Sequence, residues 1–305
     1  MKVKQFKSSD TNVSKFVFEF EKTPYTLGAV AEAVLYRYES YKKRTVICCS
    51  VQSGCPVGCT FCGTGKFFIR NLTSHEIYTQ VKECLNTIDC DPNEIEKFQI
   101  MFMSMGEPFL NTNELFQAIW DLNKLYPNAD LLVSTSAPSN MFKKLPEFIE
   151  LSNLIPKIGL QFSIHESTDE NRAKLIPTKT STLRQIAAMG EIWAAYTGRK
   201  PFFNYCVHEG NGTQEDAWRL QELFNNDVWE VTLSVICEKE ESVQSSMVRQ
   251  LEIIEKFSNY MISEGYSIRV FNPAGQDDIG GGCGQLWYFQ EWLNKNQKNK
   301  VNNEI

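Results

Sequence analysis

The sequence has little of what marks a membrane-spanning, secreted or multidomain protein. No run of about twenty apolar residues occurs, which is the length that crosses a bilayer. Residues 1–20 contain no apolar segment followed by a small-residue cleavage site. No Pro/Gly/Ser-rich stretch is long enough to be a linker, and no repeat has a fixed period. We therefore expect one main domain in the cytoplasm, monomeric and without a membrane partner.

A broad basic surface is also missing. The 305 residues carry 37 Asp and Glu against 31 Lys and Arg, a net charge of −6. Residues 1–48 carry +4 and residues 293–305 carry +2, which leaves −12 on residues 49–292. A protein that grips a long duplex through its phosphates usually shows a basic footprint. Only the N-terminal head offers one here, with Lys42, Lys43 and Arg44, and a solvated surface cluster explains these three residues equally well.

Two hydrophobic periods alternate along the chain, because short β-rich runs are separated by segments with helical spacing. The expected strands span residues 46–51, 98–103, 131–135, 158–164, 202–207, 228–236 and 267–271. One expected helix follows a capping box at residues 73–76. The other expected helices span residues 113–125, 140–151, 182–196, 214–224 and 242–264. Repeated strand–helix–strand units imply a parallel sheet, either doubly wound or a complete or partial (β/α) barrel. In each architecture, ligands bind at the carboxyl ends of the strands.

The ends of the chain differ from this pattern. Residues 1–45 form a short β-rich extension in our prediction, since residues 15–21 alternate in polarity as a hairpin strand would. Residues 46–292 would form the barrel, together with the loop after its last strand. Residues 293–305 are rich in Asn and Lys and are expected to be a frayed polar tail.

Three of the ten cysteines stand close together just after the first expected barrel strand. Cys55, Cys59 and Cys62 have CxxxCxxC spacing within a loop that contains Gly, Pro and Ser. Three thiolates at this spacing can each bind one iron of a cubane iron–sulfur cluster and leave the fourth iron open to an external ligand. A structural zinc site needs four Cys or His ligands, and a buried core segment would not have this loop composition. A cluster is therefore the preferred interpretation.

Polar residues also follow successive strands. A carboxylate there can accept hydrogen bonds from an ammonium group, and hydroxyl and imidazole groups can contact a ribose or a carboxylate. Taken singly, each has a structural explanation, such as a Gly-Glu-Pro turn or a satisfied histidine, but their recurrence at successive strand ends favours a ligand site. The residues are Gly106, Glu107, Ser134, Ser163, Ile164 and His165.

Two further cysteine positions favour thiol chemistry. Cys283 lies among glycines in residues 276–286, where a thiolate is accessible, although a glycine-rich turn with an incidental cysteine is the alternative. Cys48 and Cys49 lie in the first expected barrel strand, seven and six residues before Cys55, and if the barrel closes, this segment and the loop of Cys283 face the same cavity. Neighbouring strand residues point to opposite faces, so only one of these two thiols is expected in the cavity.

The cysteine loop and the strand-end motifs resemble the radical S-adenosylmethionine (SAM) superfamily. Their combination over residues 16–286 resembles its RlmN/Cfr family of RNA methyl synthases. The matching strings also include residues 70–73 (RNLT), 104–111 (SMGEPFLN), 134–136 (STS), 163–165 (SIH), 172–177 (RAKLIP) and 276–286 (QDDIGGGCGQL). The resemblance implies a partial (β/α)6-type barrel, a [4Fe–4S] cluster on the CxxxCxxC cysteines, and SAM bound at the open iron and the strand-end residues.

The resemblance also implies a mechanism that uses two SAM molecules. Cys283 takes a methyl group from the first, and a deoxyadenosyl radical from the second removes hydrogen from that methyl group. The methylene radical adds to C2 or C8 of an adenine in ribosomal or transfer RNA. Glu32 stands at the place of the family's base, and Cys48 at the place of the cysteine that forms a disulfide with Cys283. An electron donor such as flavodoxin is implied.

Three departures from the family concern the substrate. Residues 1–54 alone precede the cysteine loop, so the accessory domain that contacts RNA in this family is not expected. Cys237 stands where the family has an Asn that contacts SAM, and residues 269–275 lack the basic character expected there. Two alternatives remain open. One is the same chemistry on a small RNA, a nucleotide or another small molecule, and the other is a non-catalytic metal- or RNA-binding module.

Overall fold

The computed structural model describes residues 1–9, 11–24, 26–65, 67–234, 236, 243–271 and 279. These residues build a ten-stranded sheet and a separate two-stranded hairpin. In spatial order, the large sheet contains β1 (Lys2–Lys7), β2 (Val13–Phe20), β3 (Ala29–Tyr38), β4 (Arg44–Cys49), β7 (Lys97–Phe102), β8 (Asp130–Thr135), β9 (Ile158–Ser163), β10 (Phe202–Cys206), β11 (Glu230–Ser234) and β12 (Ile268–Val270). The strands from β4 through β7 to β12 run parallel, whereas β1 to β4 pair antiparallel.

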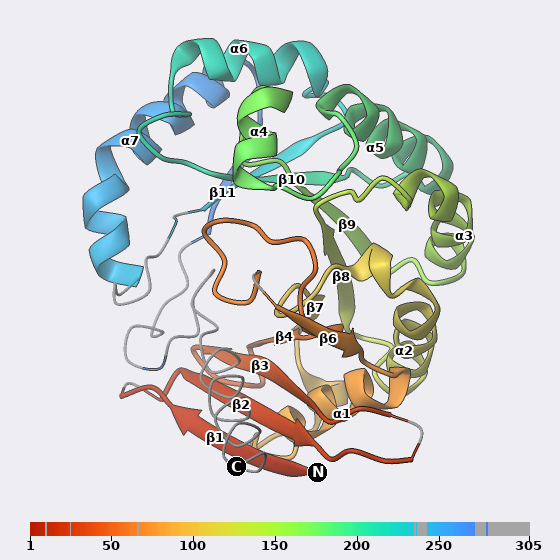
Figure 1. Cartoon of the computed structure of the whole chain (residues 1–305). Coiled ribbons are helices and arrows are strands. Elements are labelled where there is room, and N and C mark those ends of the chain that lie inside the picture. The colour runs from red at the N-terminus through yellow and green to blue at the C-terminus, as the bar shows by residue number, and fades with distance from the viewer. Residues whose placement is uncertain are drawn as a thin grey trace, which may run out of the picture.

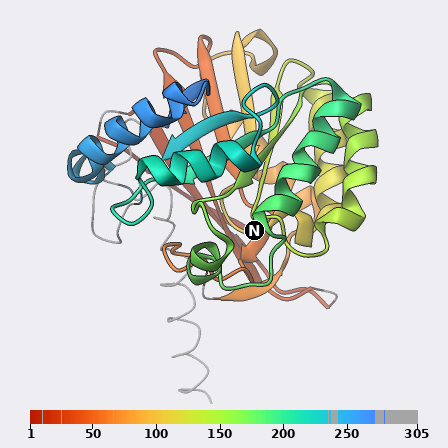
Figure 2. The ribbon, with the colours of Figure 1, turned by 90° about the horizontal axis from the view of Figure 1, so that it is seen from above.

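Helices cover the outer face of the curved sheet (Figure 1). They are α1 (Ser74–Leu85), α2 (Thr112–Leu125), α3 (Met141–Leu154), α5 (Leu183–Thr197), α6 (Gln214–Leu223) and α7 (Val243–Ser263). In the view from above, α6 and α7 lie toward one side of the molecule and α3 and α5 toward the other (Figure 2). The predicted alternation of strands and helices and the α/β fold class are confirmed. Within the described residues β1 and β12 pair on one side only, so the barrel is partial and open.

Local sequence signals explain where several helices begin. The predicted capping box is present at α1, where the Thr73 hydroxyl accepts from Glu76 N at 3.2 Å and the Glu76 carboxylate accepts from Thr73 N at 2.9 Å. A second box of the same kind, between Thr182 and Gln185, begins α5. None of the described helices is long and apolar enough to cross a membrane.

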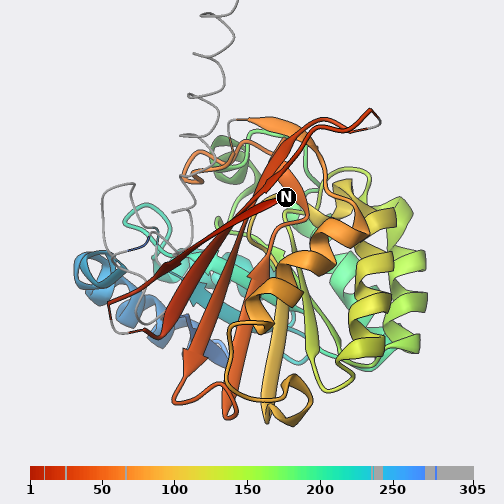
Figure 3. The same cartoon turned by 90° about the horizontal axis from the view of Figure 1, so that it is seen from below.

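The N-terminal strands extend the same sheet rather than lying apart from it. The side chains of β2 and β3 alternate between two covered faces, as a strand requires. The outer face, with Phe16, Phe18 and Ala31, joins the main core against α1, which lies across these strands in Figure 3. The inner face, with Val17 and Val30, packs against Met105 and the small hairpin. Residues 1–45 were expected to form a hairpin, and they contain three strands.

Several short elements on the inner side were not expected. The hairpin β5 (Gln52–Gly54) and β6 (Phe68–Asn71) carries the cysteine loop between its strands. The 3₁₀ turn η2 (Pro108–Leu110) follows β7, and the seven-residue helix α4 (Asp169–Leu175) follows β9. A further 3₁₀ turn, η1 (Pro92–Glu94), leads into β7.

Candidate functional site at the strand ends

The cysteine loop connects β5 to β6 and lies inside the arc formed by the strands of the curved sheet (Figure 1). Its first end is held by the hairpin, because Cys55 N donates to Phe67 O at 2.8 Å. Its middle is held by the end of α4 and the segment that follows, since Thr60 N donates to Leu175 O at 3.0 Å and the Thr178 hydroxyl donates to Val57 O at 2.6 Å. The loop is therefore fixed by residues far away in sequence.

The three thiols of this loop are neighbours of one another. Burial raises the pKa of Cys55 to about 12 and that of Cys59 well above its usual range, and in both cases the nearby Cys62 adds to the rise. Among the described residues, no three His, Cys, Asp or Glu side chains gather closely enough to hold a single metal ion. A cubane cluster binds each thiolate through a different iron. Three thiols that are close but do not converge on one point fit that group.

Gly106 and Glu107 follow β7 beside this loop. Gly106 has a φ of +97°, and a Cβ there would lie 2.5 Å from the Cβ of Gln52, so this position requires glycine. The Gln52 side chain then accepts from Glu107 N at 2.8 Å. The turn thus joins β7 to the hairpin that carries the cysteines.

The Glu107 carboxylate is buried and accepts four hydrogen bonds. One oxygen accepts from the Thr135 hydroxyl at 2.5 Å and from Phe109 N at 3.0 Å, and the other accepts from Ser136 N at 2.8 Å and the Ser136 hydroxyl at 2.7 Å. Burial raises the pKa of Glu107, and these hydrogen bonds oppose the rise. Both oxygens already have two donors, so a bound ammonium group would have to compete with them. Contact with SAM stays a prediction.

A second buried charge, Arg172 of α4, lies on the other side of Ser136. Its five N–H groups donate to Ile164 O, Thr180 Oγ1, Ser181 O, Ser136 O and Ser163 O. The ends of β8 and β9 are therefore held together by one guanidinium group. Burial lowers the pKa of Arg172 to about 10, and the neighbouring Asp169, Cys59 and Glu107 act in the opposite direction.

The predicted strand-end residues after β8 and β9 have different surroundings. The Ser134 hydroxyl faces the inner side, where it accepts from the Gln161 amide at 3.1 Å. Ser163, two residues after Gln161 on β9, pairs with Asn204 of β10. Ile164 is buried in the outer core, and its N–H donates to Asn204 O at 3.0 Å. Its backbone, not its side chain, belongs to the inner side.

His165 is held as a neutral imidazole. It has a φ of +63°, and its Nδ1 accepts from Cys206 N at 3.2 Å, so the proton of the neutral ring lies on Nε2. Burial lowers its pKa to about 3. Its ring lies edge-on to Phe61 of the cysteine loop, with 5.4 Å between the ring centres. His165 can therefore donate one hydrogen bond beside the loop.

Cys48 and Glu32 lie on the inner face of neighbouring strands. Cys48 packs with Val34, Val46 and Met101 on that face, whereas Cys49 points outward into the main core. Glu32 is fully buried. Its carbonyl accepts hydrogen bonds from hydroxyl groups at the ends of β4 and β7, Ser50 at 2.6 Å and Ser104 at 2.7 Å.

Two predicted residues, Cys237 and Cys283, lie outside the described residues. Ile279, four positions before Cys283, is described, and it packs against the cluster of side chains that contains Cys48. No disulfide bond joins any two of the eight cysteines that the structure places. The predicted bond between Cys48 and Cys283 stays a prediction.

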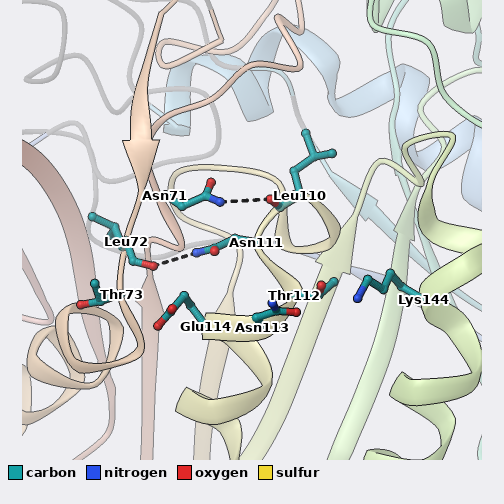
Figure 4. A pocket seen from close by; sticks show the side chains of 9 residues that line it. All are labelled: Asn71, Leu72, Thr73, Leu110, Asn111, Thr112, Asn113, Glu114 and Lys144. Atoms are coloured by element: carbon teal, nitrogen blue, oxygen red, sulfur yellow. Dashed lines mark hydrogen bonds between the residues drawn. The ribbon is translucent and has the colours of Figure 1, made fainter. Parts of the chain in front are cut away.

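A cavity of about 440 Å³ lies away from these residues, among the starts of α1 and α2 and the side of α3 (Figure 4). Asn71 and Asn111, from two of the recognised sequence strings, line it. Asn111 donates to Val51 O and Leu72 O, both at 2.8 Å, and Asn71 donates to Leu110 O at 3.3 Å. These two asparagines therefore fasten the hairpin to the turn after β7.

Sequence reasoning missed three features of the inner side. Lys15 forms an ion pair with Glu32 at 3.1 Å. Arg172 appeared only as part of a string, without a role. The amides of Gln161 and Asn204 add polar groups to the inner face of β9 and β10, where Asn204 donates to the Ser234 hydroxyl at 2.7 Å. For Gln161 and Asn204, the available signal was the alternation within β9 and β10, which places both amides on the inner face.

An open, largely parallel α/β barrel with a three-cysteine loop after its first parallel strand is the arrangement of the radical SAM class of proteins. A crystal structure of a radical SAM methyltransferase from Sphaerobacter thermophilus superposes with a TM-score of 0.72 at 26% identity, over 92% of this chain and 79% of that one. Streptococcus suis SuiB bound to S-adenosylmethionine superposes with a TM-score of 0.51 at 13% identity, over 74% of this chain and 46% of that one, a likeness of fold alone.

Sequence comparison narrows the class. The chain is 30% identical over 292 residues to a protein of Petrotoga mobilis named probable dual-specificity RNA methyltransferase RlmN, covering 93% of this chain and 77% of that protein. It is 29% identical over 290 residues to a protein of Nitrosopumilus maritimus named ribosomal RNA large subunit methyltransferase N, covering 92% and 78%. No family model matches the chain. The chain belongs to the RlmN family of radical SAM methyltransferases.

Proposed function

We propose that this methyltransferase methylates an amidine carbon, C2 or C8, of an adenine in ribosomal or transfer RNA, through a methyl group carried on Cys283. The relatives reported above are named as RNA methyltransferases. The observation that carries the proposal is the inner side of the sheet. There the loop thiols lie beside Glu107 and Arg172, and Phe61 of the loop contacts His165. Cys48 and Glu32 lie on the inner face of the same sheet.

Cys55, Cys59 and Cys62 would hold a [4Fe–4S] cluster, which the donor set fits. When bound, the cluster supplies the single electron that cleaves SAM reductively. The chain's own part is to bind SAM beside the loop. The Nε2–H of His165, the hydroxyl of Ser134 and the backbone at Ser163 and Ile164 offer hydrogen bonds there, with Cys237 at the remaining family position.

The proposed steps balance in atoms and electrons. Cys283 Sγ loses its proton and displaces S-adenosylhomocysteine from the first SAM, becoming S-methylated. With a second SAM held beside the loop of Cys55, Cys59 and Cys62, one electron passed from a carrier such as flavodoxin through the cluster would cleave it to methionine and a deoxyadenosyl group. That group would take one hydrogen atom from the S-methyl group of Cys283. The methylene carbon bonds to the ring carbon, Glu32 takes the proton of that carbon, and one electron returns to the carrier. Cys48 thiolate then attacks Cys283 Sγ, which breaks the S–CH2 bond, and the released carbon takes a proton to become methyl.

This division of roles follows from the chemistry of the acceptor. An amidine carbon is not nucleophilic, so direct displacement on SAM cannot methylate it, whereas a carbon radical adds to it. The Glu32 side chain has no exposed area. To meet a ring carbon, it therefore needs the acceptor to displace a group that covers it now. A dry site of this kind also protects a radical from side reactions.

A second candidate keeps the chemistry but uses a smaller acceptor, such as a small RNA, a nucleotide or another small molecule. The net charge of −12 on residues 49–292 favours it, because it weakens the attraction for a large folded RNA.

The test uses anaerobically reconstituted protein, which should show the broad visible absorption of a [4Fe–4S] cluster and release 5′-deoxyadenosine from SAM. The protein is then incubated with methyl-labelled SAM and either total RNA or a small-molecule pool. Label in adenine of RNA supports the proposal, and label only in small molecules supports the second candidate. A colourless protein that binds zinc or RNA without releasing 5′-deoxyadenosine contradicts both.

A further inference from the structure

A buried ion pair lies on the inner face of β2 and β3. Lys15 Nζ and Glu32 Oε2 are 3.1 Å apart, and the exposed fractions of the two side chains are 9% and 0%. Val17 pairs with Glu32 and Lys15 pairs with Val34, so the lysine reaches diagonally from one strand to the next. On the same face, Val13, Val17, Val30, Val34 and Tyr36 are buried apolar or aromatic neighbours. Glu19, near the end of β2, is partly exposed and pairs with Lys4 of β1.

Stability does not explain this pair. Two charges removed from water lose more hydration than their attraction commonly returns, and apolar side chains of similar volume are often as stable or more so. The opposite face of the same strands follows the apolar solution, since Phe16, Phe18 and Ala33 join the main core there. A buried acid and base among valines is the kind of local exception that marks a functional site.

The pair also lies close to the predicted chemistry. Lys15, Val34 and Cys48 occupy one row across β2, β3 and β4, all on the inner face. The backbone of Glu32 is fixed by the hydroxyls of Ser50 and Ser104. With the backbone held, the ammonium group of Lys15, 3.1 Å from Glu32 Oε2, is placed to orient the carboxylate and to favour its charged form.

We propose that Lys15 is a positioning residue that holds Glu32 as an aimed carboxylate, ready to take the proton of the attacked ring carbon. The inference rests on the proposed function. In that step the bonding electrons of the C–H bond stay with the ring, the proton passes to a Glu32 oxygen, and one electron returns to the carrier protein. A thioether between Cys283 and the base remains for Cys48 to cleave. Without the ammonium group, burial among apolar side chains favours the protonated carboxyl, which cannot accept the proton.

The experiment follows one turnover of the reconstituted full-length enzyme with RNA, using Lys15→Met, Lys15→Gln and Lys15→Arg. Lys4→Met is the matched control, because Lys4 pairs with Glu19 on the exposed strand β1. Three quantities are measured: 5′-deoxyadenosine, protein–RNA adduct on a denaturing gel, and free methylated RNA. Lys15→Met and Lys15→Gln should keep 5′-deoxyadenosine formation within about twofold, accumulate adduct and release methylated RNA at least tenfold more slowly.

Lys15→Arg should restore at least half of the release rate, since it keeps the charge, and Lys4→Met should match the unsubstituted enzyme. Release of methylated RNA at the normal rate by Lys15→Met or Lys15→Gln would overturn the inference. An equal loss of 5′-deoxyadenosine and methylated RNA in either variant, or no rescue by Lys15→Arg, would overturn it as well. If the unsubstituted enzyme forms no methylated RNA, the proposed function itself fails, and that outcome is seen before any variant is compared.

Discussion

Buried charges occur in two regions of this molecule, and their surroundings differ. At the ends of the parallel strands, Glu107 accepts four hydrogen bonds and Arg172 donates five, all with uncharged partners. On the antiparallel strands, Lys15 and Glu32 meet as an ion pair among valines. Charges whose hydrogen bonds are saturated hold a scaffold in place. The first region therefore supports the strand ends, and the second is the one for which we propose proton transfer.

The largest expected effect on stability is that of Arg172→Met. It leaves a group of buried carbonyl and hydroxyl oxygens at the ends of β8 and β9 without their donor. We expect the free energy of unfolding to fall by about 3 to 5 kcal/mol, measured by urea denaturation. Lys174→Met on the same helix is the control, because its pair with Glu170 is exposed to solvent and contributes little to stability. Equal losses in the two variants would contradict a supporting role for Arg172.

Glu107→Gln should have a smaller effect. The amide keeps one acceptor oxygen, but its NH2 group meets either the Ser136 pair of donors or the donors from Thr135 and Phe109. We expect a loss of about 1 to 3 kcal/mol in the same denaturation experiment. An unchanged midpoint would show that these four hydrogen bonds do not support the strand ends.

His165 makes the stability of this region depend on pH. Burial lowers its folded-state pKa to about 3, below the unfolded value near 6.5. Its contribution is therefore complete above pH 6.5 and is lost as the pH falls from 6.5 towards 3. The slope should be about 1.4 kcal/mol per pH unit. The variant His165→Asn suits this position because asparagine tolerates a positive φ. In it, the pH dependence of the unfolding free energy that His165 causes should disappear from urea denaturation curves measured between pH 6 and 4. Parallel curves for the two proteins would contradict the assignment.

The smallest effect on stability is expected where the charges are meant to react. The double variant Lys15→Met with Glu32→Leu replaces the ion pair by apolar side chains. Its unfolding free energy should stay within about 1 kcal/mol of the unsubstituted protein or rise, as for other buried pairs. Release of methylated RNA should nevertheless stop. A strongly destabilised double variant would place this pair with the supporting charges and remove the difference between the regions.

Much of the scaffold could be predicted because its signals are long and periodic. The parallel strands and the helices after them repeat two distinct periods, and the capping box at Thr73 marked where α1 begins. The hairpin β5–β6 and helix α4 are only three to seven residues long, which is too short for a period to show. Arg172 therefore had no visible role, although its string was recognised.

The site was predicted less completely because burial depends on tertiary packing. Lys15 fits an alternating strand, and in such a strand a lysine is normally read as facing solvent. Its side chain is nevertheless only 9% exposed and lies 3.1 Å from the Glu32 carboxylate of the next strand, which no local pattern records. Glu107 illustrates the opposite case, since its recognised position gave no hint that four donors of the chain itself surround it.

The most direct test of the central claim follows the methyl group itself through one turnover, using SAM with a CD3 group and mass spectrometry of the Cys283 peptide, the RNA and 5′-deoxyadenosine. Methylation through Cys283 predicts CD3 on Cys283 before RNA is added. It then predicts one deuterium in 5′-deoxyadenosine and a CD2H group on C2 or C8 of adenine. An intact CD3 group in the RNA, or a Cys283 that never carries label, would contradict the account.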